Sequence, residues 1–282
     1  MAATDPIAIV ACGGLLALEC IAQARADGRL ARVIALEGES APEVIAAADD
    51  VLKWGQVGLL IKALERSGAR RVLLIGSIAH RPDFRSVLGD FETIKWLPRL
   101  LTTMSGGDDS VLRKVIGFFE SGGYEIVSIA DVAPDLLAPA GLLTSTPPSD
   151  TNKQDIALGF DVLAALAPFD VGQAVVVGKG RVAAVEGAEG TDAVIDRAGE
   201  MQRARRVAWK DRTGILVKAT KWDQDLRVDL PAIGPRTIER CAAAGLAGVA
   251  IEAGRVVIAS RRECLDLANR LGLFILSRPR TD

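Results

Sequence analysis

The sequence predicts an α/β protein with a Rossmann-like, parallel-sheet N-terminal domain and an α+β C-terminal domain. In the first half, short β-branched runs alternate with segments of helical periodicity, a pattern typical of a parallel sheet covered by helices. In the second half, closely spaced strands joined by glycine-containing turns are mixed with helices, as in α+β domains. The length of 282 residues also suits two domains of roughly 150 residues each.

The N-terminal elements follow from apolar runs and from the residues that bound them. A β-branched run lies between Pro6 and Gly13, one helical pattern ends near Gly28, and another ends at Gly68. The run at 71–76 is strongly apolar, as expected for a strand that is buried on both faces of a parallel sheet. In chain order we expect strands at 7–11, 32–36, 71–76 and 124–129, and helices at 15–26, 57–67 and 111–120.

A change in composition marks the boundary between the two domains. Four prolines, together with serines and threonines, are concentrated between Ala133 and Ser149, and such a stretch favours a linker. We therefore expect a Rossmann-like nucleotide-binding domain over 1–133, a linker over 134–150 and an α+β catalytic domain over 151–282.

The C-terminal elements are predicted from caps and turns. Thr151 and Gln154 have the spacing of a capping box, so we expect a helix from there to Leu166. Strands at 173–177 and 181–186 are separated by Gly178-Lys179-Gly180, which predicts a hairpin. The remaining elements are expected to be a helix from Thr191, a strand at 215–218, a helix after Gly234-Pro235, and a second hairpin with strands at 248–252 and 255–259.

Composition excludes several functional classes. The 34 Lys and Arg residues do not exceed the 36 Asp and Glu residues, so we expect no nucleic acid partner. Because His80 is the one histidine, HExxH zinc sites and His-rich di-metal centres are excluded. The four cysteines lack C-x-x-C spacing, which favours a reducing cytoplasm over a disulfide framework. No apolar segment reaches the ~20 residues that a membrane span requires.

The first candidate binding feature is the turn Ala11-Cys12-Gly13-Gly14-Leu15, which joins the first strand to the first helix. Glycines there allow a phosphate to approach the backbone, and a helix N-terminus offers free N–H groups. The turn lacks the GxGxxG spacing of dinucleotide-binding folds, so a plain tight turn is the alternative. Glu37 ends the second strand, where it is either a ribose-binding acid or a solvated surface residue.

Two more features lie in the N-terminal half. His80 follows the strand at 71–76, and its loop is expected at the carboxyl end of the sheet, where ligands bind in such folds. A packing or surface role is the alternative for His80. Asp108 and Asp109 follow Gly106-Gly107 at the start of a helix, where they either cap the helix or hydrogen-bond a ribose or base.

The strongest candidate is a pair of charged segments in the C-terminal half, at 185–193 and 217–231. Carboxylates hold Mg²⁺, while Lys and Arg neutralise phosphoryl oxygens, so the mixture predicts metal-assisted phosphoryl transfer to water. A surface salt-bridge network is the alternative. If the second segment is extended, one of its faces carries Lys221, Asp223, Asp225, Arg227 and Asp229.

These residues together resemble the UDP-2,3-diacylglucosamine pyrophosphatases of lipid A biosynthesis, the LpxI type. The resemblance covers nearly the whole chain, and the order and spacing of the motifs are specific. The motifs are Ala11-Cys12-Gly13-Gly14-Leu15, Arg81-Pro82-Asp83-Phe84, Gly107-Asp108-Asp109, Ala133–Leu137, Asp170–Val177, Glu186–Asp192 and Gln224–Pro231. The chain departs from the family pattern at Trp222-Asp223, which makes Asp223 the weakest of the candidate acids.

The resemblance implies a two-domain, Mg²⁺-dependent enzyme that cleaves the pyrophosphate of UDP-2,3-diacylglucosamine with water. The products are UMP and 2,3-diacylglucosamine 1-phosphate (lipid X), and water is expected to attack the phosphorus on the sugar side. The partners are therefore a lipid-linked UDP-sugar and lipid X. The family is cytoplasmic or peripherally associated with the inner membrane, and a homodimer is a further expectation.

The resemblance also implies roles for individual residues, with Asp225 central to the chemistry. The implied catalytic residues are Asp192, Lys218, Asp225 and Arg227. The implied metal ligands are Glu189, Asp192 and Asp225. The implied substrate contacts are Gly13, Gly14, Leu15, Ser77, Asp108, Asp109, Thr144, Gln173 and Thr191.

Two other functions are compatible with parts of the sequence. A nicotinamide-dependent oxidoreductase would bind NAD(P) without requiring Mg²⁺, and a non-catalytic sensor would bind UDP-sugars without releasing UMP. The clustered acids favour hydrolysis, because a sensor gains little from carboxylates beside a pyrophosphate. We further expect the two domains to close around the substrate, with its acyl chains in an apolar groove.

Overall fold

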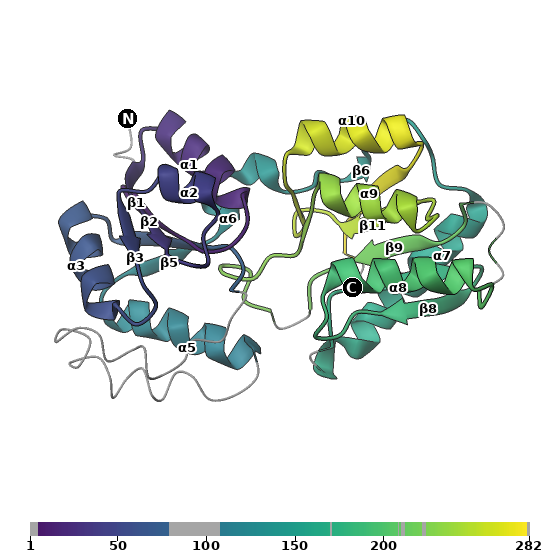
Figure 1. Ribbon diagram of the computed structural model, residues 1–282, viewed down its shortest axis with the longest axis horizontal. Helices are drawn as coiled ribbons and strands as arrows, with labels where there is room; N and C mark the ends of the chain where they lie inside the picture. Colours follow the sequence, from purple (N-terminus) through teal and green to yellow (C-terminus); the bar gives the residue numbers. More distant parts are fainter. Residues whose placement is uncertain are drawn as a thin grey trace. The chain divides into compact units, whose positions relative to one another are not determined.

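A computed structural model describes residues 5–78, 108–169, 171–207, 209, 212–221 and 224–280, with the side chains of 108–111 left out. Contacts divide the chain into two compact units. Unit 1 comprises residues 1–134 and 225–229, and unit 2 comprises residues 135–224 and 230–282. A short segment late in the sequence therefore belongs to the N-terminal unit. Figure 1 shows the elements of both units.

Unit 1 is built on a parallel five-stranded sheet with the strand order β3-β2-β1-β4-β5. This is the order of doubly wound folds that bind nucleotides where the order reverses, here between β1 and β4. Its elements are β1 (Ile7–Ala11), α1 (Leu16–Ala26), β2 (Leu30–Leu36), α2 (Pro42–Ala46), β3 (Asp50–Leu52), α3 (Val57–Ser67), β4 (Arg71–Ile75), α5 (Asp108–Ser121), β5 (Glu125–Val127) and α6 (Ile129–Val132).

Helices cover both faces of this sheet. On one face, Leu64 of α3 and Ile116 of α5 join a core with Ala8, Val72 and Ile126 of the strands. On the other face, α1 contacts β1 and β2, and α6 contacts β4. The strands are buried on both sides because they lie between these helix layers, as the apolar sequence of β4 predicts. The parallel N-terminal sheet of the sequence analysis is thus confirmed.

The ends of the elements in unit 1 follow local chemistry. Helix α3 has the predicted bounds and ends at Gly68, which adopts the left-handed conformation that glycine tolerates best. The strand predicted at 124–129 is shorter, because Ser128 begins a new helix. Ser128 and Asp131 form a capping box that stabilises the first turn of α6.

Unit 2 contains a mixed six-stranded sheet with the order β6-β13-β11-β9-β7-β8. Strands β9, β11 and β13 are parallel, whereas β6, β7 and β8 join antiparallel at the sides. The elements are β6 (Gly141–Leu142), α7 (Asp150–Leu166), β7 (Ala174–Gly178), β8 (Arg181–Val185), α8 (Thr191–Arg203), β9 (Ile215–Lys218), β10 (Ala232–Ile233), α9 (Pro235–Ala243), β11 (Gly248–Glu252), β12 (Val257–Ile258), α10 (Arg261–Leu271) and β13 (Phe274–Arg278). Short 3₁₀ helices lie at Pro134–Leu136 and Ala167–Phe169.

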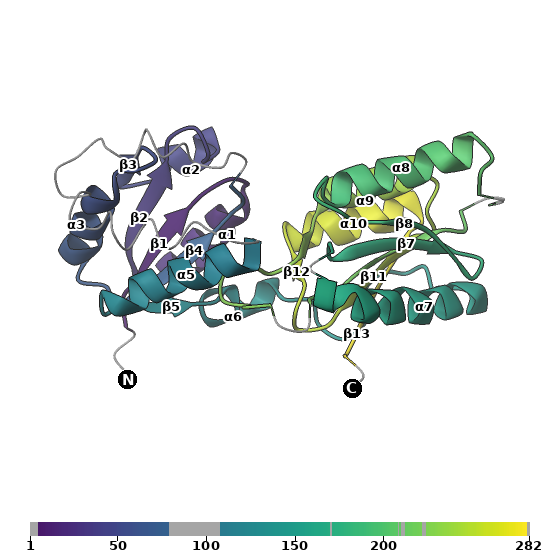
Figure 2. The same cartoon turned by 90° about the horizontal axis from the view of Figure 1, so that it is seen from below.

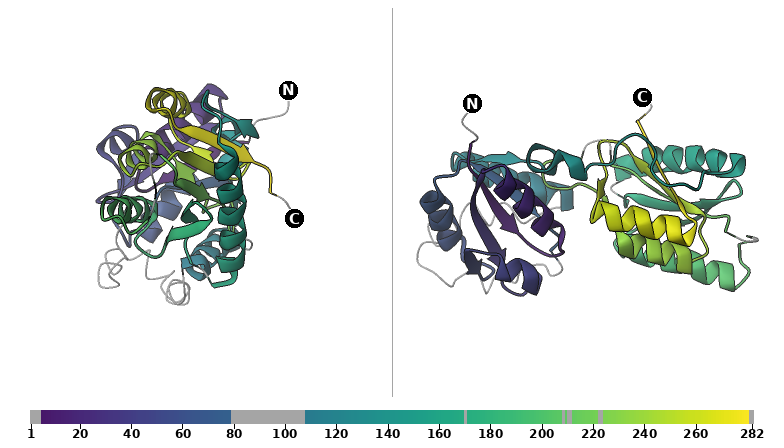
Figure 3. Two further views of the ribbon diagram at one scale, coloured as in Figure 1. Left: turned by 90° about the vertical axis from the view of Figure 1, so that its right-hand side faces the viewer. Right: turned by 90° about the horizontal axis from the view of Figure 1, so that it is seen from above.

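The two faces of this sheet are covered by different helices. Helix α7 lies on one face, and α8, α9 and α10 lie on the other (Figures 2 and 3). Because side chains alternate along a strand, Val217 of β9 faces α7 and Leu216 faces α8 and α9. By the same alternation Lys218 lies on the α8 face, whereas Glu252 at the end of β11 lies on the α7 face.

Two predictions for unit 2 were wrong. The capping box of α7 is formed by Ser149 and Asn152 and not by Thr151 and Gln154, because the helix already begins at Asp150. The strands around Ala253-Gly254 are not a hairpin, since β11 pairs in parallel with β9 and β13. Strand β12 pairs instead with β10 in a separate two-stranded sheet. The hairpin of β7 and β8 is confirmed.

Within the part of the chain that is described, no helix is long and apolar enough to cross a membrane. The proline-rich stretch at 134–150 carries β6, which pairs with β13. Ala138 in this stretch is buried and donates its N–H to the carbonyl of Val256. The stretch is therefore packed into unit 2 over part of its length.

Candidate functional site

The carboxyl ends of β1 and β4 in unit 1 are joined by an isolated bridge between Gly13 and Ser77. The Gly13 N–H donates to the Ser77 carbonyl at 2.8 Å, and the Ser77 N–H donates back at 3.2 Å. Two predicted substrate contacts thus meet where the strand order reverses, which is the usual ligand position in such sheets.

Glycine is required at Gly13 and at Gly14 for different structural reasons. A Cβ on Gly13 would lie 2.8 Å from the carbonyl oxygen of Ser77, so the close approach of the two loops requires glycine there. Gly14 has a φ of +89° and open space around its Cα. Helix α1 then begins without a side-chain cap, at Leu15, which is 54% exposed. Its first turn is accessible, as a phosphate-binding helix N-terminus must be.

The segment containing Asp225 forms a tight turn in unit 1. The N–H groups of Val228 and Asp229 both donate to the Asp225 carbonyl at 3.2 Å. The segment 225–229 is therefore a turn and is not extended, so the condition for a shared face of the odd-numbered residues is not met here. Val228 packs against the core of unit 1, which anchors the turn.

Asp225 and Arg227 are joined by a two-pronged ion pair on this turn. Arg227 donates from Nε to Oδ1 at 2.9 Å and from Nη2 to Oδ2 at 2.6 Å. Its Nη1 donates to Oε1 of Glu120, on α5, at 2.7 Å. The hydrogen bonds from Arg227 lower the pKa of Asp225, although partial burial opposes the shift. The same carboxylate raises the pKa of Arg227, so both groups stay charged at neutral pH.

Three predicted residues of unit 2 meet at one edge of its sheet, together with Glu186. Lys218 donates from Nζ to Oγ1 of Thr191 at 2.9 Å and to the carbonyl of Ala232 at 2.9 Å. Thr191 donates from Oγ1 to Oε1 of Glu186 at 2.8 Å. The N–H of Gln173 donates to Oε2 of Glu186 at 2.9 Å. We call Gln173, Glu186, Thr191 and Lys218 the Lys218 cluster.

The two acids predicted beside this cluster each have arginine partners. Glu189 accepts an ion pair from Nη1 of Arg197 at 2.9 Å. Oδ2 of Asp192 forms ion pairs with Nη2 of Arg236 at 3.0 Å and with Nε of Arg240 at 3.2 Å. The Asp192 side chain is 46% exposed. Asp192 also lies in the first turn of α8, where the helix dipole favours negative charge.

The predicted metal ligands do not form a cluster within either described unit. Among the described residues, no group of three or more His, Cys, Asp or Glu side chains is arranged to hold a metal ion. Glu189 and Asp192 belong to unit 2, and Asp225 belongs to unit 1. Oδ2 of Asp225 accepts one described hydrogen bond, and a carboxylate oxygen can accept two. Asp225 thus retains an oxygen suited to Mg²⁺, which usually takes one or two carboxylates together with substrate phosphates.

The remaining predicted contacts are placed differently. Thr144 is buried, and its Oγ1 accepts the N–H of Ile275 of β13 at 2.9 Å. By strand register Ile275 is level with Leu216 of β9, two strands away from β9, and Thr144 is not among the hydrogen-bonded residues of the Lys218 cluster. Asp108 and Asp109 open helix α5, as expected for caps or ligand contacts at a helix start. Several predictions lie outside the described residues: His80, Arg81-Pro82-Asp83-Phe84, Gly106-Gly107, Asp170 and Asp223.

Sequence reasoning did not assign roles to three buried or bridging acids. Glu186 organises the Lys218 cluster, and Glu120 holds Arg227. Glu252 is 2% exposed and binds both the N–H and the hydroxyl of Thr220. Glu186 and Glu252 each stand at or just after the end of a strand, and that position is the signal that could have found them.

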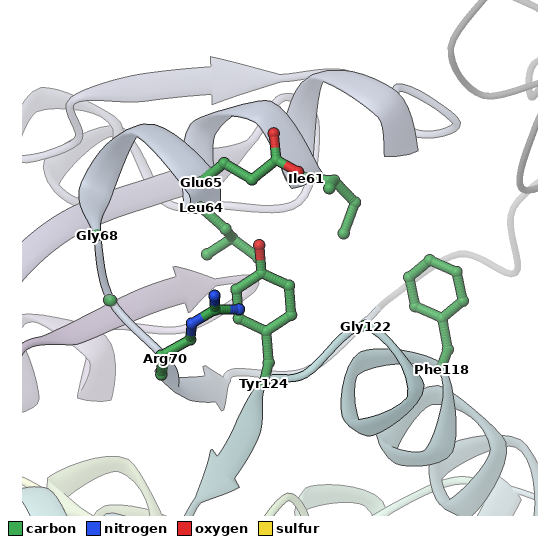
Figure 4. A pocket seen from close by; sticks show the side chains of 9 residues that line it. Ile61, Leu64, Glu65, Gly68, Arg70, Phe118, Gly122 and Tyr124 are labelled. Atoms are coloured by element: carbon green, nitrogen blue, oxygen red, sulfur yellow. The ribbon is translucent and has the colours of Figure 1, made fainter.

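Two cavities lie away from these groups of residues. A cavity of about 350 Å³ in unit 1 opens at the amino ends of β4 and β5, opposite the Gly13–Ser77 bridge. Figure 4 shows Glu65, Arg70, Phe118 and Tyr124 lining it. Burial and, secondarily, Glu65 raise the pKa of the Tyr124 hydroxyl. A smaller cavity of about 100 Å³ lies on the α7 face of unit 2.

Comparisons with known proteins cover almost the whole chain. Residues 6–136 match the family model of the LpxI N-terminal domain, and residues 139–276 match that of the LpxI C-terminal domain. The chain is 37% identical over 270 residues to the UDP-2,3-diacylglucosamine pyrophosphatase LpxI of Caulobacter vibrioides. That alignment covers 96% of each of the two chains.

Proposed function

The chain belongs to the LpxI family, and we propose that it hydrolyses the pyrophosphate of UDP-2,3-diacylglucosamine in lipid A biosynthesis. Water adds to the phosphorus on the sugar side, and the bond from that phosphorus to the UMP oxygen breaks. The products are UMP and 2,3-diacylglucosamine 1-phosphate, lipid X. The observation that carries this proposal is the 37% identity, over 96% of both chains, to a relative named for this activity.

The charged groups of both units suit a diphosphate substrate. The substrate presents several phosphoryl oxygens, and its hydrolysis develops further negative charge that cations stabilise. Lys218 and Arg227 supply this positive charge from positions that are fixed by hydrogen bonds before substrate arrives. We assign the Gly13-Gly14 turn and Ser77 to the nucleotide or sugar, because they lie where the strand order of unit 1 reverses.

Mg²⁺ is the cation that best fits the acids of this family site. Asp225 would hold it together with the substrate phosphates, and the ligand roles that the resemblance implies for Glu189 and Asp192 stay predictions. When bound, Mg²⁺ neutralises phosphoryl oxygens and lowers the pKa of attacking water. The arginines now paired with Glu189 and Asp192 compete with the cation for these carboxylates.

The lipid portion of the substrate favours an enzyme that acts at a membrane surface. Acyl chains are strongly apolar, at ~0.8 kcal/mol for each buried CH₂ group. Leu15 and Ile78 are large apolar side chains that are exposed on the two loops joined by the Gly13–Ser77 bridge. We assign them to the acyl chains, and we place the protein in the cytoplasm, peripherally at the inner membrane, as a homodimer.

The direct experiment incubates the purified chain with UDP-2,3-diacylglucosamine and Mg²⁺ and measures UMP and lipid X. We expect stoichiometric release of both products, loss of activity with EDTA and recovery with added Mg²⁺. Binding of the substrate without UMP release would favour a sensor. Binding of NADH, detected by fluorescence, with no UMP release would favour an oxidoreductase.

A further inference from the structure

We infer that Glu186 is a positioning residue that orients Lys218 through the hydroxyl of Thr191. This inference rests on the proposed function for its kinetic consequences, because it assigns a purpose to a buried acid beside a proposed catalytic cation. The geometry alone also makes a prediction about Lys218 that does not depend on the reaction.

The three side chains form one continuous chain of hydrogen bonds. Lys218 Nζ lies 2.9 Å from Thr191 Oγ1, which lies 2.8 Å from Oε1 of Glu186. Glu186 and Lys218 are each 8% exposed, so water has little access to these bonds. A buried polar group that loses its partner is costly, which keeps the chain intact in the folded protein.

The direction of the chain is determined by the chemistry of its ends. An ammonium group donates hydrogen bonds and cannot accept them, whereas a carboxylate accepts them. The Thr191 hydroxyl must therefore accept from Lys218 and donate to Glu186. Glu186 thus selects the one orientation of the hydroxyl proton that leaves a lone pair facing the ammonium.

The fold brings these three residues together from three separate elements. Lys218 ends β9, Glu186 follows β8, and Thr191 is the first residue of α8. Lys218 pairs in register with Ala174 at the beginning of β7, and the Ala174 carbonyl accepts the N–H of Glu186 at 2.9 Å. Strand pairing therefore fixes the backbones, and the hydroxyl of Thr191 fixes the ammonium of Lys218.

A rigid ammonium matters because displacement of a catalytic group by about 1 Å can lower turnover by about a hundredfold. We expect Thr191→Val, which keeps the shape but removes the hydroxyl, to lower kcat by roughly ten- to a hundredfold. KM should change by less than about threefold, because the misplaced charge acts mainly in the transition state. Glu186→Gln should act in the same direction, and Thr191→Ser should restore kcat to within about threefold, since serine retains the hydroxyl.

A double-variant comparison separates positioning from a general structural effect. If Thr191 acts through Lys218, Thr191→Val should lower kcat further by less than about twofold in a Lys218→Met background. A structural effect would instead lower kcat by the same factor in both backgrounds. Asp155→Asn is the matched control, because Asp155 is buried and binds the N–H groups of Lys179 and Gly180 at the other end of the hairpin. It should lower thermal stability without lowering kcat.

The second measurement needs no substrate. Lysines are acetylated with acetic anhydride, and the rate at Lys218 is followed by mass spectrometry. We expect slow labelling of Lys218 in the starting protein and in Thr191→Ser and Asp155→Asn. Thr191→Val and Glu186→Gln should label at least about fivefold faster, because the buried ammonium loses the Thr191 hydrogen bond and keeps the one to the Ala232 carbonyl. Exposed Lys153 serves as the internal reference.

The two proposals fail in distinguishable ways. If the starting protein releases no UMP, the proposed function fails, and the labelling rates still decide the role of Glu186. The inference is overturned if Thr191→Val and Glu186→Gln keep the original Lys218 labelling rate. It is also overturned if Thr191→Val lowers kcat equally with and without Lys218.

Discussion

Asp225 and Arg227 are two residues apart, and the guanidinium of Arg227 contacts both oxygens of the Asp225 carboxylate, at 2.9 and 2.6 Å. The pair lies on the tight turn at 225–229, where the backbone N–H of Arg227 also donates to Oδ1 of Asp225 at 3.1 Å. Glu120 holds the same guanidinium from α5. The proposed central acid is thereby linked through Arg227 to helix α5 of unit 1.

Loss of the Asp225 charge should stop turnover while leaving the fold intact. We expect Asp225→Asn to lower kcat by about a hundredfold or more, since it removes charge stabilisation that acts in the transition state. KM should change by only a few-fold. Glu120→Gln is the control, because it removes the charge of one partner of Arg227 but leaves the pair with Asp225. Steady-state UMP release from both variants checks this, and near-normal kcat for Asp225→Asn would remove Asp225 from the chemistry.

The Asp225–Arg227 pair should stabilise the protein in a pH-dependent manner. The pKa of Asp225 in the folded chain lies below its ordinary value of 3.8. The pair therefore contributes its full stability above that value, and the contribution is lost as the pH falls through the lowered pKa. The melting temperatures of Arg227→Gln and of the starting protein should differ most near neutral pH. The two temperatures should converge toward about pH 2.

A matched control for these melts is Arg25→Gln. It removes the same charge from an exposed position on α1 for which no acidic partner is described. The difference in melting temperature between Arg25→Gln and the starting protein should stay nearly constant over the same pH range. If the melting-temperature difference for Arg227→Gln is also constant with pH, the Asp225–Arg227 pair does not couple stability to the charge of Asp225.

Mg²⁺ activation should distinguish a metal-ligating acid from a surface ion pair. Asp192 and Asp196 both lie on α8 and both pair with Arg240. We expect Asp192→Asn to raise the Mg²⁺ concentration for half-maximal activity by about tenfold or more. Asp196→Asn should change it by less than about threefold. Equal effects of the two substitutions would place Asp192 in a surface network with Arg240.

The bridge between Gly13 and Ser77 should depend on Gly76. A Cβ on Gly76 would lie 2.8 Å from the carbonyl carbon of Cys12 and closer still to the Gly13 carbonyl oxygen, and its φ is +103°. Gly28 also has a positive φ, +67°, but open space around it. Gly28→Ala should cost about 1–2 kcal/mol of unfolding free energy through backbone strain alone. Gly76→Ala should cost ~1–3 kcal/mol more, through overpacking.

Urea unfolding of both alanine variants measures this difference. Gly76→Ala should also raise KM for the substrate more than Gly28→Ala does, because the displaced bridge carries two proposed substrate contacts. Equal free energies of unfolding for Gly28→Ala and Gly76→Ala would show that the loops carrying Gly13 and Ser77 separate without a free-energy cost.

The local elements were largely predictable because each depends on neighbours in sequence. The strands at 7–11, 215–218 and 248–252 and the helix at 57–67 have the predicted bounds. Apolar periodicity and terminal glycines determine such segments over a few residues. Helix α10 and strand β13 were not predicted: α10 is strongly polar, and β13 is a short apolar run, although Gly272 between the two is a helix-ending signal that was available.

The sequence by itself determined the fold class, the elements and the residue types of a phosphate-handling site. It also identified the family through the order of its motifs. The tertiary structure alone decided which charges meet. Arg227 reaches Glu120 across 107 positions, and Lys218 reaches Thr191 across 27. Such contacts depend on strand order and on the face to which each side chain points, and neither is set by residues nearby in the chain.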